Sequence, residues 1–337
     1  MKKPFQRAGP DRTQAIRRWF QVLFLALNVW IGAEFYLFVR YYETGGRTGF
    51  AQRPPGIEGW LPIASLMNLK VWLYTGGLPS VHPAGVFLLI SFLLISWLAR
   101  KSFCSWLCPV GTLSQYLAKL GRRLFRRNFR LPRGLDVPLR ALKYILMGLF
   151  LYVIAAMSVD QIRAFLSGPY GIVADVKMLN FFRTLTLAGV AVLALLAAAS
   201  VLVENFWCRY LCPYGGLLGL LALASPLKIK RDAALCIDCG KCAKACPSAL
   251  KVDQLITISS AECTGCLSCV ASCPVENALY VSAVGRRKVP VWAMAAAIAV
   301  LFFGCVGIAQ WTGHWHTKLP QKVYMELVPR ANEFEHP

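Results

Sequence analysis

Five long runs of apolar residues punctuate the chain, and segments rich in charge, glycine or cysteine separate them. The runs cover residues 19–39, 83–99, 144–159, 184–203 and 289–311. Each comes close to the ~20 residues that a helix needs to cross the apolar core of a bilayer. A backbone in lipid must satisfy its own hydrogen bonds, so helices are the expected form. The pattern predicts about five transmembrane helices.

Charged residues in or beside these runs are few. The first run has a basic start and continues to Tyr41 without a small-residue cleavage site, which indicates a retained anchor and not a signal peptide. Glu34 interrupts it, and this carboxylate could take a proton from a quinol or sit near the outer interface. Arg140 and Lys143 flank the third run, where their stems can snorkel.

An apolar stretch at 60–74 is too short to span the membrane, and we expect it to lie in the interface or to form a re-entrant segment.

Charge placement predicts the orientation. The chain is 57% hydrophobic and 16% charged, with a net charge of +21, which fits nucleic acid, anionic lipid or positive-inside loops. Lys and Arg number six, eleven and ten in residues 1–18, 100–143 and 204–288, but three each in 41–82, 160–183 and 312–337. This alternation predicts a cytoplasmic N-terminus and an extracytoplasmic tail. It favours membrane lipid as the partner of the basic charge and disfavours nucleic acid.

The strongest chemical signal is a cysteine motif that occurs twice. The spacing C-x2-C-x2-C-x3-C-P covers Cys236, Cys239, Cys242 and Cys246, and recurs in Cys263, Cys266, Cys269 and Cys273. Such spacing wraps three thiolates around one cubane and sends the fourth to the other. The first [4Fe–4S] cluster should therefore use Cys236, Cys239, Cys242 and Cys273, and the second Cys263, Cys266, Cys269 and Cys246.

A pair of zinc sites is the alternative for this block. Zinc sites use four ligands per ion in two separated pairs, and tandem quartets that each end in Cys-Pro do not fit that pattern. The block instead predicts a bacterial two-cluster ferredoxin domain, each half a short strand–helix–strand unit. Cluster ligation requires thiolates and hence a reducing compartment.

A second cysteine motif, C-x3-C-P, follows two of the apolar runs. It comprises Cys104 and Cys108, and then Cys208 and Cys212, 104 residues later. This offset indicates an internal repeat in the membrane part. Positions i and i+4 share one face of a helix, so each pair should present two sulfurs together. The four thiols could form a third metal or cluster site or a redox dithiol pair, or they could be buried structural thiols.

Neighbouring residues add hypotheses about this site. Trp106, Tyr210 and Arg209 place aromatic and cationic groups beside the thiols, which suits a quinone headgroup or an anionic cluster. Arg100 and Glu204 precede the two pairs at equivalent positions, where they could pair with each other or simply mark the interface. The thirteenth cysteine, Cys305, lies in the fifth run, where packing is the expected role.

Residues 83–283, with tandem C-x3-C-P motifs and then a two-cluster ferredoxin block, resemble the NapH, NosR and CcoG type of membrane polyferredoxins. The resemblance implies multi-span inner-membrane proteins with cytoplasmic clusters. NapH-like members resemble quinol dehydrogenase subunits that feed periplasmic reductases. NosR-like members add a periplasmic flavin-binding domain, and CcoG-like members act in copper oxidase maturation with a large extracytoplasmic domain. We expect neither addition here, and the fifth helix departs from the four-helix NapH pattern.

These observations predict a membrane all-α bundle with a small α+β ferredoxin domain. The expected segments are a basic N-terminus (1–18), a transmembrane repeat region (19–224), the ferredoxin domain (225–288), a fifth helix (289–311) and an extracytoplasmic tail (312–337). The expected function is electron transfer between a quinone or quinol pool and a partner redox enzyme in a bacterial inner membrane. This would make it a subunit of a quinol dehydrogenase-type complex, and the alternative is a maturation factor for a membrane or periplasmic metalloenzyme.

Overall fold

The computed structural model describes residues 11–126, 129, 131–283 and 287–336, so the predicted N-terminal segment 1–18 is described only from Asp11 onward. The chain divides into two compact units. The first unit comprises Met1–Leu25, Phe92–Met147 and Ala194–Leu301, and the second Ala26–Ser91, Gly148–Leu193 and Phe302–Pro337. The boundary between them falls inside the five apolar helices, so each of these helices contributes residues to both units.

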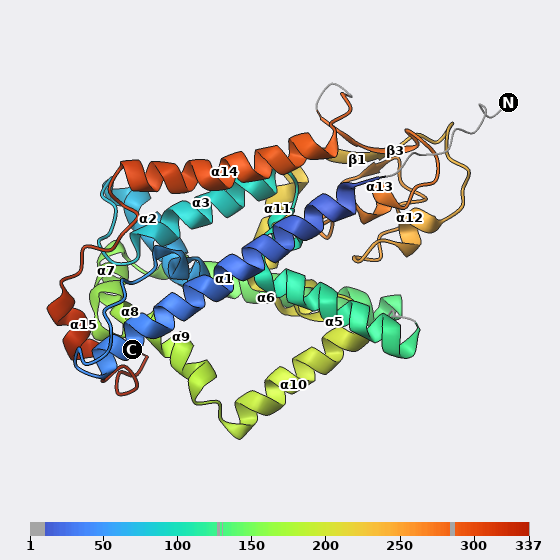
Figure 1. The fold of residues 1–337 in the computed structure, drawn as a ribbon. Coiled ribbons are helices and arrows are strands. Elements are labelled where there is room, and N and C mark those ends of the chain that lie inside the picture. The colour runs from blue at the N-terminus through green and yellow to red at the C-terminus, as the bar shows by residue number, and fades with distance from the viewer. Residues whose placement is uncertain (1–10, 127–128, 130, 284–286, 337) are drawn as a thin grey trace. The chain divides into compact units, whose positions relative to one another are not determined.

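The apolar runs form helices whose bounds differ from those expected (Figure 1). They are α1 (Thr13–Glu43), α3 (Pro83–Leu98), α6 (Arg133–Ala156), α10 (Leu187–Leu202) and α14 (Val291–Trp311). Just before α1, the Asp11 carboxylate accepts the Thr13 N–H at 2.7 Å. Helix α6 ends where Ser158 and Gln161 form the capping box of the next helix.

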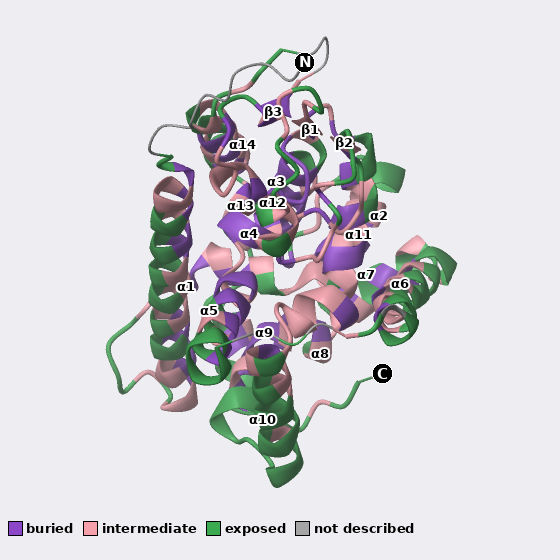
Figure 2. Cartoon of the chain, turned by 90° about the vertical axis from the view of Figure 1, so that its right-hand side faces the viewer, coloured by how far each residue is buried: buried purple, intermediate pink, exposed green. Residues whose placement is uncertain are grey.

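Fewer helices than five are long enough to cross a membrane. In the described part of the chain three qualify, α1, α6 and α14. Helix α9 (Ala174–Arg183) and α10 form a fourth span only if they count together, because they are bent by 85°. Helix α3 has 16 residues, which is short for a crossing. The structure therefore supports three to four spans, and the predicted fifth is not established. Side chains along α10 are largely exposed, as lipid-facing residues would be (Figure 2).

The C-x3-C-P pairs do not lie on continuous helices as expected. Cys104 lies in the short helix α4 (Phe103–Trp106), whereas Cys108 caps α5 (Pro109–Phe125). Cys208 lies in the π-helical turn η2 (Trp207–Leu211), and Cys212 caps α11 (Pro213–Leu221), which continues into η3 (Ala222–Ala224). The proline after each second cysteine lacks an N–H and is favoured at the first helical position, so a new helix begins there.

The ferredoxin block is a small sheet with two helical turns. Its elements are β1 (Lys228–Arg231), α12 (Lys241–Lys244), β2 (Thr257–Ile258), α13 (Ser268–Ala271) and β3 (Leu279–Ser282), grouped together in Figure 1. The strand order is β2-β1-β3, and both pairings are antiparallel. Ile229 of β1 faces Ile258 on one side and Val281 on the other. The described residues form three strands, one fewer than two strand–helix–strand units would contribute.

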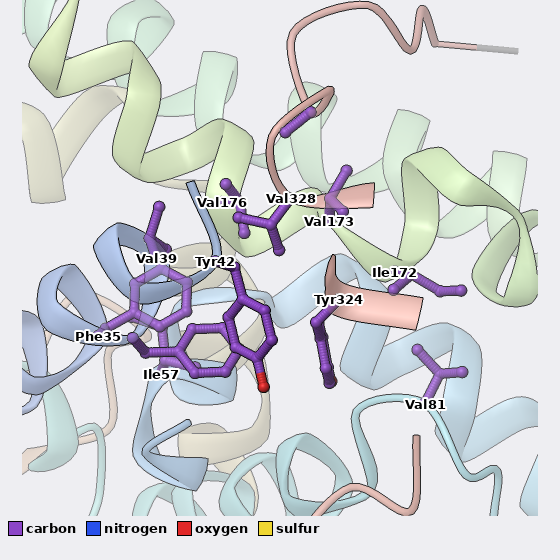
Figure 3. Packing of buried hydrophobic residues seen from close by; sticks show 12 residues of the cluster. Phe35, Val39, Tyr42, Ile57, Val81, Ile172, Val173, Val176, Tyr324 and Val328 are labelled. Atoms are coloured by element: carbon purple, nitrogen blue, oxygen red, sulfur yellow. The ribbon is translucent and has the colours of Figure 1, made fainter. Parts of the chain in front are cut away.

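The second unit has its own apolar core. Phe35, Phe38 and Tyr42 of α1 pack with Tyr324 of α15 (Gln321–Leu327), and Figure 3 shows several of these rings together with neighbouring valines. The expected short apolar stretch forms α2 (Pro62–Thr75), which shares a second cluster with α7 (Val159–Ser167). The remaining elements of this unit are η1 (Pro55–Trp60) and α8 (Pro169–Ile172).

A buried ion network stabilises the second unit. The Arg53 guanidinium donates to Glu58 at 2.6 Å and to Asp175 at 2.8 Å, and Glu58 also accepts the Gly85 N–H. Burial opposes the charged form of Glu58, but Arg53 and His82 hold the pKa of this carboxyl below its usual range. Charges buried here are thus paired and hydrogen-bonded, as their desolvation demands.

Candidate functional site

The eight ferredoxin cysteines fall into two groups that match the crossed pattern expected from the spacing. Two cavities of about 20 Å³ are each lined by four of them. We call one set the exposed quartet, which consists of Cys236, Cys239, Cys242 and Cys273. The other is the buried quartet, which consists of Cys246, Cys263, Cys266 and Cys269. Each set therefore combines three cysteines of one motif with the fourth cysteine of the other.

Left-handed backbone turns bring these sulfurs together. Gly240 and Gly265 have φ values of 66° and 61°, a conformation that glycine adopts without strain. Gly265 is also held close to the first unit's helical part, because an added Cβ there would lie 3.1 Å from the Ala99 carbonyl oxygen. Asp238 and Leu267 in the same turns also have positive φ values, of 55° and 56°. Glycine at 240 and 265 therefore lowers the strain of turning the chain around each cavity.

The two quartets differ in exposure. Cys263, Cys266 and Cys269 are 7%, 7% and 6% exposed, whereas Cys239 is exposed to solvent. Burial raises the pKa of the Cys246 thiol to about 12. A thiolate in such surroundings needs a nearby positive charge, which iron supplies. Four sulfurs and apolar walls suit an iron–sulfur cluster in either cavity.

The buried quartet is fixed to the helical part of the first unit by hydrogen bonds to its loop backbone. Trp106, which has no exposed surface, donates its indole N–H to the Gly265 carbonyl at 3.1 Å. Ser105 donates to the Thr264 carbonyl at 2.6 Å, and Gln14 of α1 donates to the Cys266 carbonyl at 3.0 Å. Helix α4, which Figure 2 shows largely buried, is therefore the helix on which this loop packs.

Arg100 lies beside the same quartet. Its guanidinium donates to the Ser260 carbonyl at 2.9 Å, and the side chain is 2% exposed. Burial raises the pKa of the Cys263 thiol, and the positive charge of Arg100 partly offsets that rise. The contacts described for Arg100 do not include Glu204, which accepts from Arg122 at 3.0 Å. The interfacial role expected from the sequence stays a prediction.

The four C-x3-C-P cysteines also gather in the first unit. We call Cys104, Cys108, Cys208 and Cys212 the helix-end quartet. The Cys208 sulfur lies within electrostatic reach of the other three. Burial raises the pKa of Cys104 to about 12 and that of Cys108 to about 11. Burial thus disfavours the thiolate form of these free cysteines, and ligation by a metal ion or cluster would reverse this effect.

Helix starts hold the second cysteine of each pair. The Cys212 sulfur accepts the Gly215 N–H at 3.3 Å, and backbone N–H groups of Gly111 and Val110 favour the anionic form of Cys108. The partial positive charge of a helix N-terminus has the same effect. Gly111 is required by packing, since an added Cβ would lie 2.1 Å from the Cys104 carbonyl oxygen.

A buried polar network joins the helix-end quartet to the ferredoxin block. A cavity of about 30 Å³ is lined by Cys104, Cys208 and Lys101 together with Glu262 of the block. Glu262 accepts from Lys143 at 2.6 Å and from the Tyr144 hydroxyl at 2.8 Å. Burial opposes the ionised form of Glu262, yet Lys143 and Lys101 hold its pKa below the usual range.

Sequence reasoning missed this network. Lys143 was expected to snorkel, but it has no exposed surface and pairs with Glu262. The available signals were the position of Glu262 directly before Cys263 and of Lys101 three residues before Cys104. A helical pattern along the chain does not show the contact between Lys143 and Glu262, because these residues are 119 positions apart.

The aromatic and cationic neighbours of the thiols have protein partners. Trp106 holds the Gly265 carbonyl, while Tyr210 donates to Asp136 at 2.6 Å and Arg209 to the same carboxylate at 3.0 Å. These contacts anchor α4 and η2 and do not leave the side chains lining a quinone-sized pocket.

Within the described ranges, no three His, Cys, Asp or Glu side chains converge as a single metal ion requires.

Two buried or half-buried quartets in a ferredoxin fold, beside membrane-length helices, define a membrane iron–sulfur protein. A family model described as "4Fe-4S binding domain" matches residues 81–132 and 185–232, and one described as "4Fe-4S dicluster domain" matches residues 229–281. The chain belongs to the NapH and NosR type of membrane polyferredoxins, an iron–sulfur electron transport family. The resemblance inferred from the motifs is thus confirmed.

Several relatives support this assignment. The chain is 48% identical over 326 residues to "Putative electron transport protein YccM" of Escherichia coli (strain K12), which covers 95% of this chain and 91% of the relative. It is 28% identical to regulatory protein NosR of Pseudomonas aeruginosa, over 66% of this chain and 32% of that protein. It is 27% identical to ferredoxin-type protein NapH of Haemophilus influenzae, over 55% of this chain and 63% of that protein. No solved structure matches the chain.

Proposed function

We propose that the chain carries electrons between a membrane quinone pool and a partner redox protein, through two [4Fe–4S] clusters and a third site at the helix-end quartet. Cysteines 236, 239, 242 and 273 would hold one cluster, and 246, 263, 266 and 269 the other. A [4Fe–4S] cluster, when bound, supplies reversible one-electron chemistry. The protein's own contribution is to ligate, orient and insulate these groups.

The observation that carries the proposal is the graded environment of the three quartets. The helix-end quartet shares a cavity with Glu262 and Thr264, which flank Cys263 of the buried quartet. The two ferredoxin quartets exchange one cysteine each through the crossed motifs, and the exposed quartet reaches solvent through Cys239. Such a series supports a route from the apolar helices to a water-soluble surface.

Quinone itself should bind outside the helix-end cavity. That cavity measures about 30 Å³, whereas ligand pockets usually measure about 300–1,000 Å³. Trp106, Tyr210 and Arg209 are also committed to protein contacts. We therefore assign the helix-end quartet to the relay and not to the quinone headgroup.

Serine substitutions of the helix-end cysteines test the relay. Cys104→Ser and Cys212→Ser should each lower quinol-dependent reduction of the ferredoxin clusters by at least about 100-fold, since metal ligands act as a unit. The ferredoxin clusters should remain visible by electron paramagnetic resonance after chemical reduction. Cys305→Ser is the matched control, because Cys305 lies in α14 apart from the three quartets. Full electron flow in either test variant would show that the quartet is structural.

A deletion strain separates transfer from maturation. If the chain carries electrons, its partner reductase should be fully assembled and metallated but receive no electrons from quinol. A partner that lacks its metal in the deletion strain would contradict the transfer proposal and favour a maturation factor.

The proposal places the ferredoxin block in the cytoplasm, on the basis of the Lys and Arg asymmetry. A reporter that is active only in the periplasm should be active when fused after Trp311 and silent when fused after Ala283. The opposite result would reverse the sidedness while leaving the cluster assignment intact.

A further inference from the structure

One cavity of the first unit is separate from the cysteine sites. It measures about 520 Å³, which is within the usual size of a ligand pocket. Helix α1 contributes Gln14, Arg17 and Arg18 to it, and α5 contributes Gln115, Lys119 and Arg122. Lys244 and Ser268 of the ferredoxin block complete the wall, together with Glu204.

The lining is strongly positive. Five cationic side chains face one carboxylate, and that carboxylate, Glu204, accepts from Arg122 at 3.0 Å. Burial and the like charges of Arg17 and Arg18 lower the pKa of Lys119. Cations that repel one another in this way are stabilised by a bound anion. The described residues that line the cavity are mostly polar or cationic, which suits an anionic ligand.

Arg17 is held rigidly in this wall. It is 6% exposed, and its guanidinium donates to neutral oxygens, Gln14 Oε1 at 2.8 Å and Gln115 Oε1 at 3.0 Å. It also donates to the Ser105 carbonyl at 3.4 Å. These hydrogen bonds do not neutralise the guanidinium, so its charge acts on anionic groups nearby, which include Glu204, the Cys266 sulfur and any anion bound in the cavity.

Helix α5 indicates the source of the anion. Its cavity-lining cations are Lys119 and Arg122, whereas an exposed apolar stripe at helical spacing lies on another face, formed by Leu113, Tyr116, Leu120 and Leu124. Trp19, which is 76% exposed, follows Arg18 at the start of α1. A cationic face beside an exposed apolar stripe is typical of a helix lying at a membrane surface, and tryptophan favours that depth.

We propose that this cavity binds the headgroup of an anionic phospholipid, and that a lipid with two phosphodiester groups, of the cardiolipin type, fits it best. The phosphates would meet the cations of α1, α5 and α12, and the acyl chains would follow the apolar stripe of α5. Basic pockets beside membrane helices recognise such lipids. The lipid would fasten the ferredoxin block to the helices, and this inference does not depend on the proposed electron route.

Lipid retention by the full chain tests the proposal. Protein purified in mild detergent is titrated with cardiolipin, phosphatidylglycerol or phosphatidylcholine, and bound lipid is counted by native mass spectrometry. Each cation near a headgroup contributes about fivefold to affinity, so Lys119→Gln with Lys244→Gln should weaken cardiolipin binding about 30-fold. The matched control, Arg123→Gln with Lys241→Gln, removes equal charge from the same two helices outside the cavity.

The expected pattern is tight cardiolipin binding that the cavity variant loses and the control keeps, with clusters still visible by absorbance in both. Equal loss of cardiolipin binding in both variants would mean that binding depends on the total positive charge, and it would overturn the proposed site. Equal binding of phosphatidylcholine would overturn the anion requirement. Tight binding of inorganic pyrophosphate in lipid-free detergent, without competition by cardiolipin, would assign the cavity to a soluble anion and overturn the lipid proposal.

Discussion

The same cysteine motif occurs twice in the ferredoxin block, yet the two quartets occupy opposite environments. The exposed quartet opens to solvent through Cys239, whereas three cysteines of the buried quartet are at most 7% exposed. The difference lies outside the motifs, in the residues of α4 and α1 that cover one quartet and leave the other open. Sequence spacing thus defines a cluster site, while tertiary contacts decide which partner the site can meet.

The comparison is sharpest in the access of small reagents to iron. In anaerobically loaded protein, a water-soluble iron chelator added after mild oxidation should remove iron in two phases, with rates about 100-fold apart, because exposure controls attack on a cluster. Cys239→Ser should remove the fast phase and retain the slow one. Iron release is followed by chelator absorbance. A single phase, or loss of the slow phase in Cys239→Ser, would contradict the assigned exposures.

A somewhat smaller difference is expected from Glu262→Gln, which leaves Lys143 buried without its carboxylate. Removing one partner of a buried ion pair costs about 3 kcal/mol, measured as thermal unfolding of the buried quartet's absorbance. Glu276→Gln, exposed beside the exposed quartet, is the control and should change stability little. Equal stability of wild type and Glu262→Gln at pH 7 would show that the ion pair does not hold the block.

The pH dependence of this effect has a definite sign. The folded-state pKa of Glu262 lies below the unfolded value, so its stabilisation is complete above about pH 4.3 and is lost as the pH falls through the folded-state pKa. Between pH 5 and 8 the wild type should therefore lose no stability through Glu262. The difference in stability between wild type and Glu262→Gln should shrink only in more acidic solution.

Trp106→Phe should have a more modest effect. It removes the hydrogen bond to Gly265 and part of a fully buried ring, at a cost of about 1–2 kcal/mol. The signal of the buried quartet should broaden, while that of the exposed quartet stays as in wild type. Trp97→Phe in α3, where the indole is 43% exposed, provides the control. A change of signal confined to the exposed quartet would show that the buried quartet does not depend on packing against α4.

The smallest expected difference is electrostatic. Arg100→Gln removes a buried positive charge beside Cys263 and should lower the reduction potential of the buried quartet's cluster, by roughly tens of millivolts. Arg231→Gln is its counterpart at the exposed quartet, where solvent screens the charge and the shift should be smaller. Redox titration followed by electron paramagnetic resonance measures both. An equal shift at both clusters would mean that Arg100 acts through the general field.

The sequence predicted the features that depend on local spacing. The crossed grouping of Cys246 with Cys263 follows from motif geometry, and the family resemblance follows from the same motifs. The hydrophobic pattern located all five apolar helices but not their bounds: α1 and α6 extend beyond their apolar runs, whereas α10 is shorter than its run. The pattern does not show where a cap or a proline starts a new helix. It also placed both cysteines of each C-x3-C-P pair on one helix, although Pro109 and Pro213 begin new ones.

Contacts between distant segments lay beyond sequence reasoning. Lys143 carries the signature of a snorkelling side chain, and only the position of Glu262 makes it a buried ion pair. The Arg53 network of the second unit was likewise hidden, since Arg53 and Asp175 lie 122 residues apart. Burial of a charge depends on its partner, and no periodicity along the chain reports that partner.

The covering of the buried quartet also has a consequence for how the protein is made. With Trp106, Ser105 and Gln14 bound to its loop backbone, the sulfurs of Cys263, Cys266 and Cys269 are closed to any large donor of iron and sulfide. Helices α1 and α4 are synthesised before these cysteines leave the ribosome. A cluster in this quartet would therefore have to be inserted before the block packs on α4, and its delivery would compete with folding in time. The exposed quartet, by contrast, could be filled or repaired afterwards.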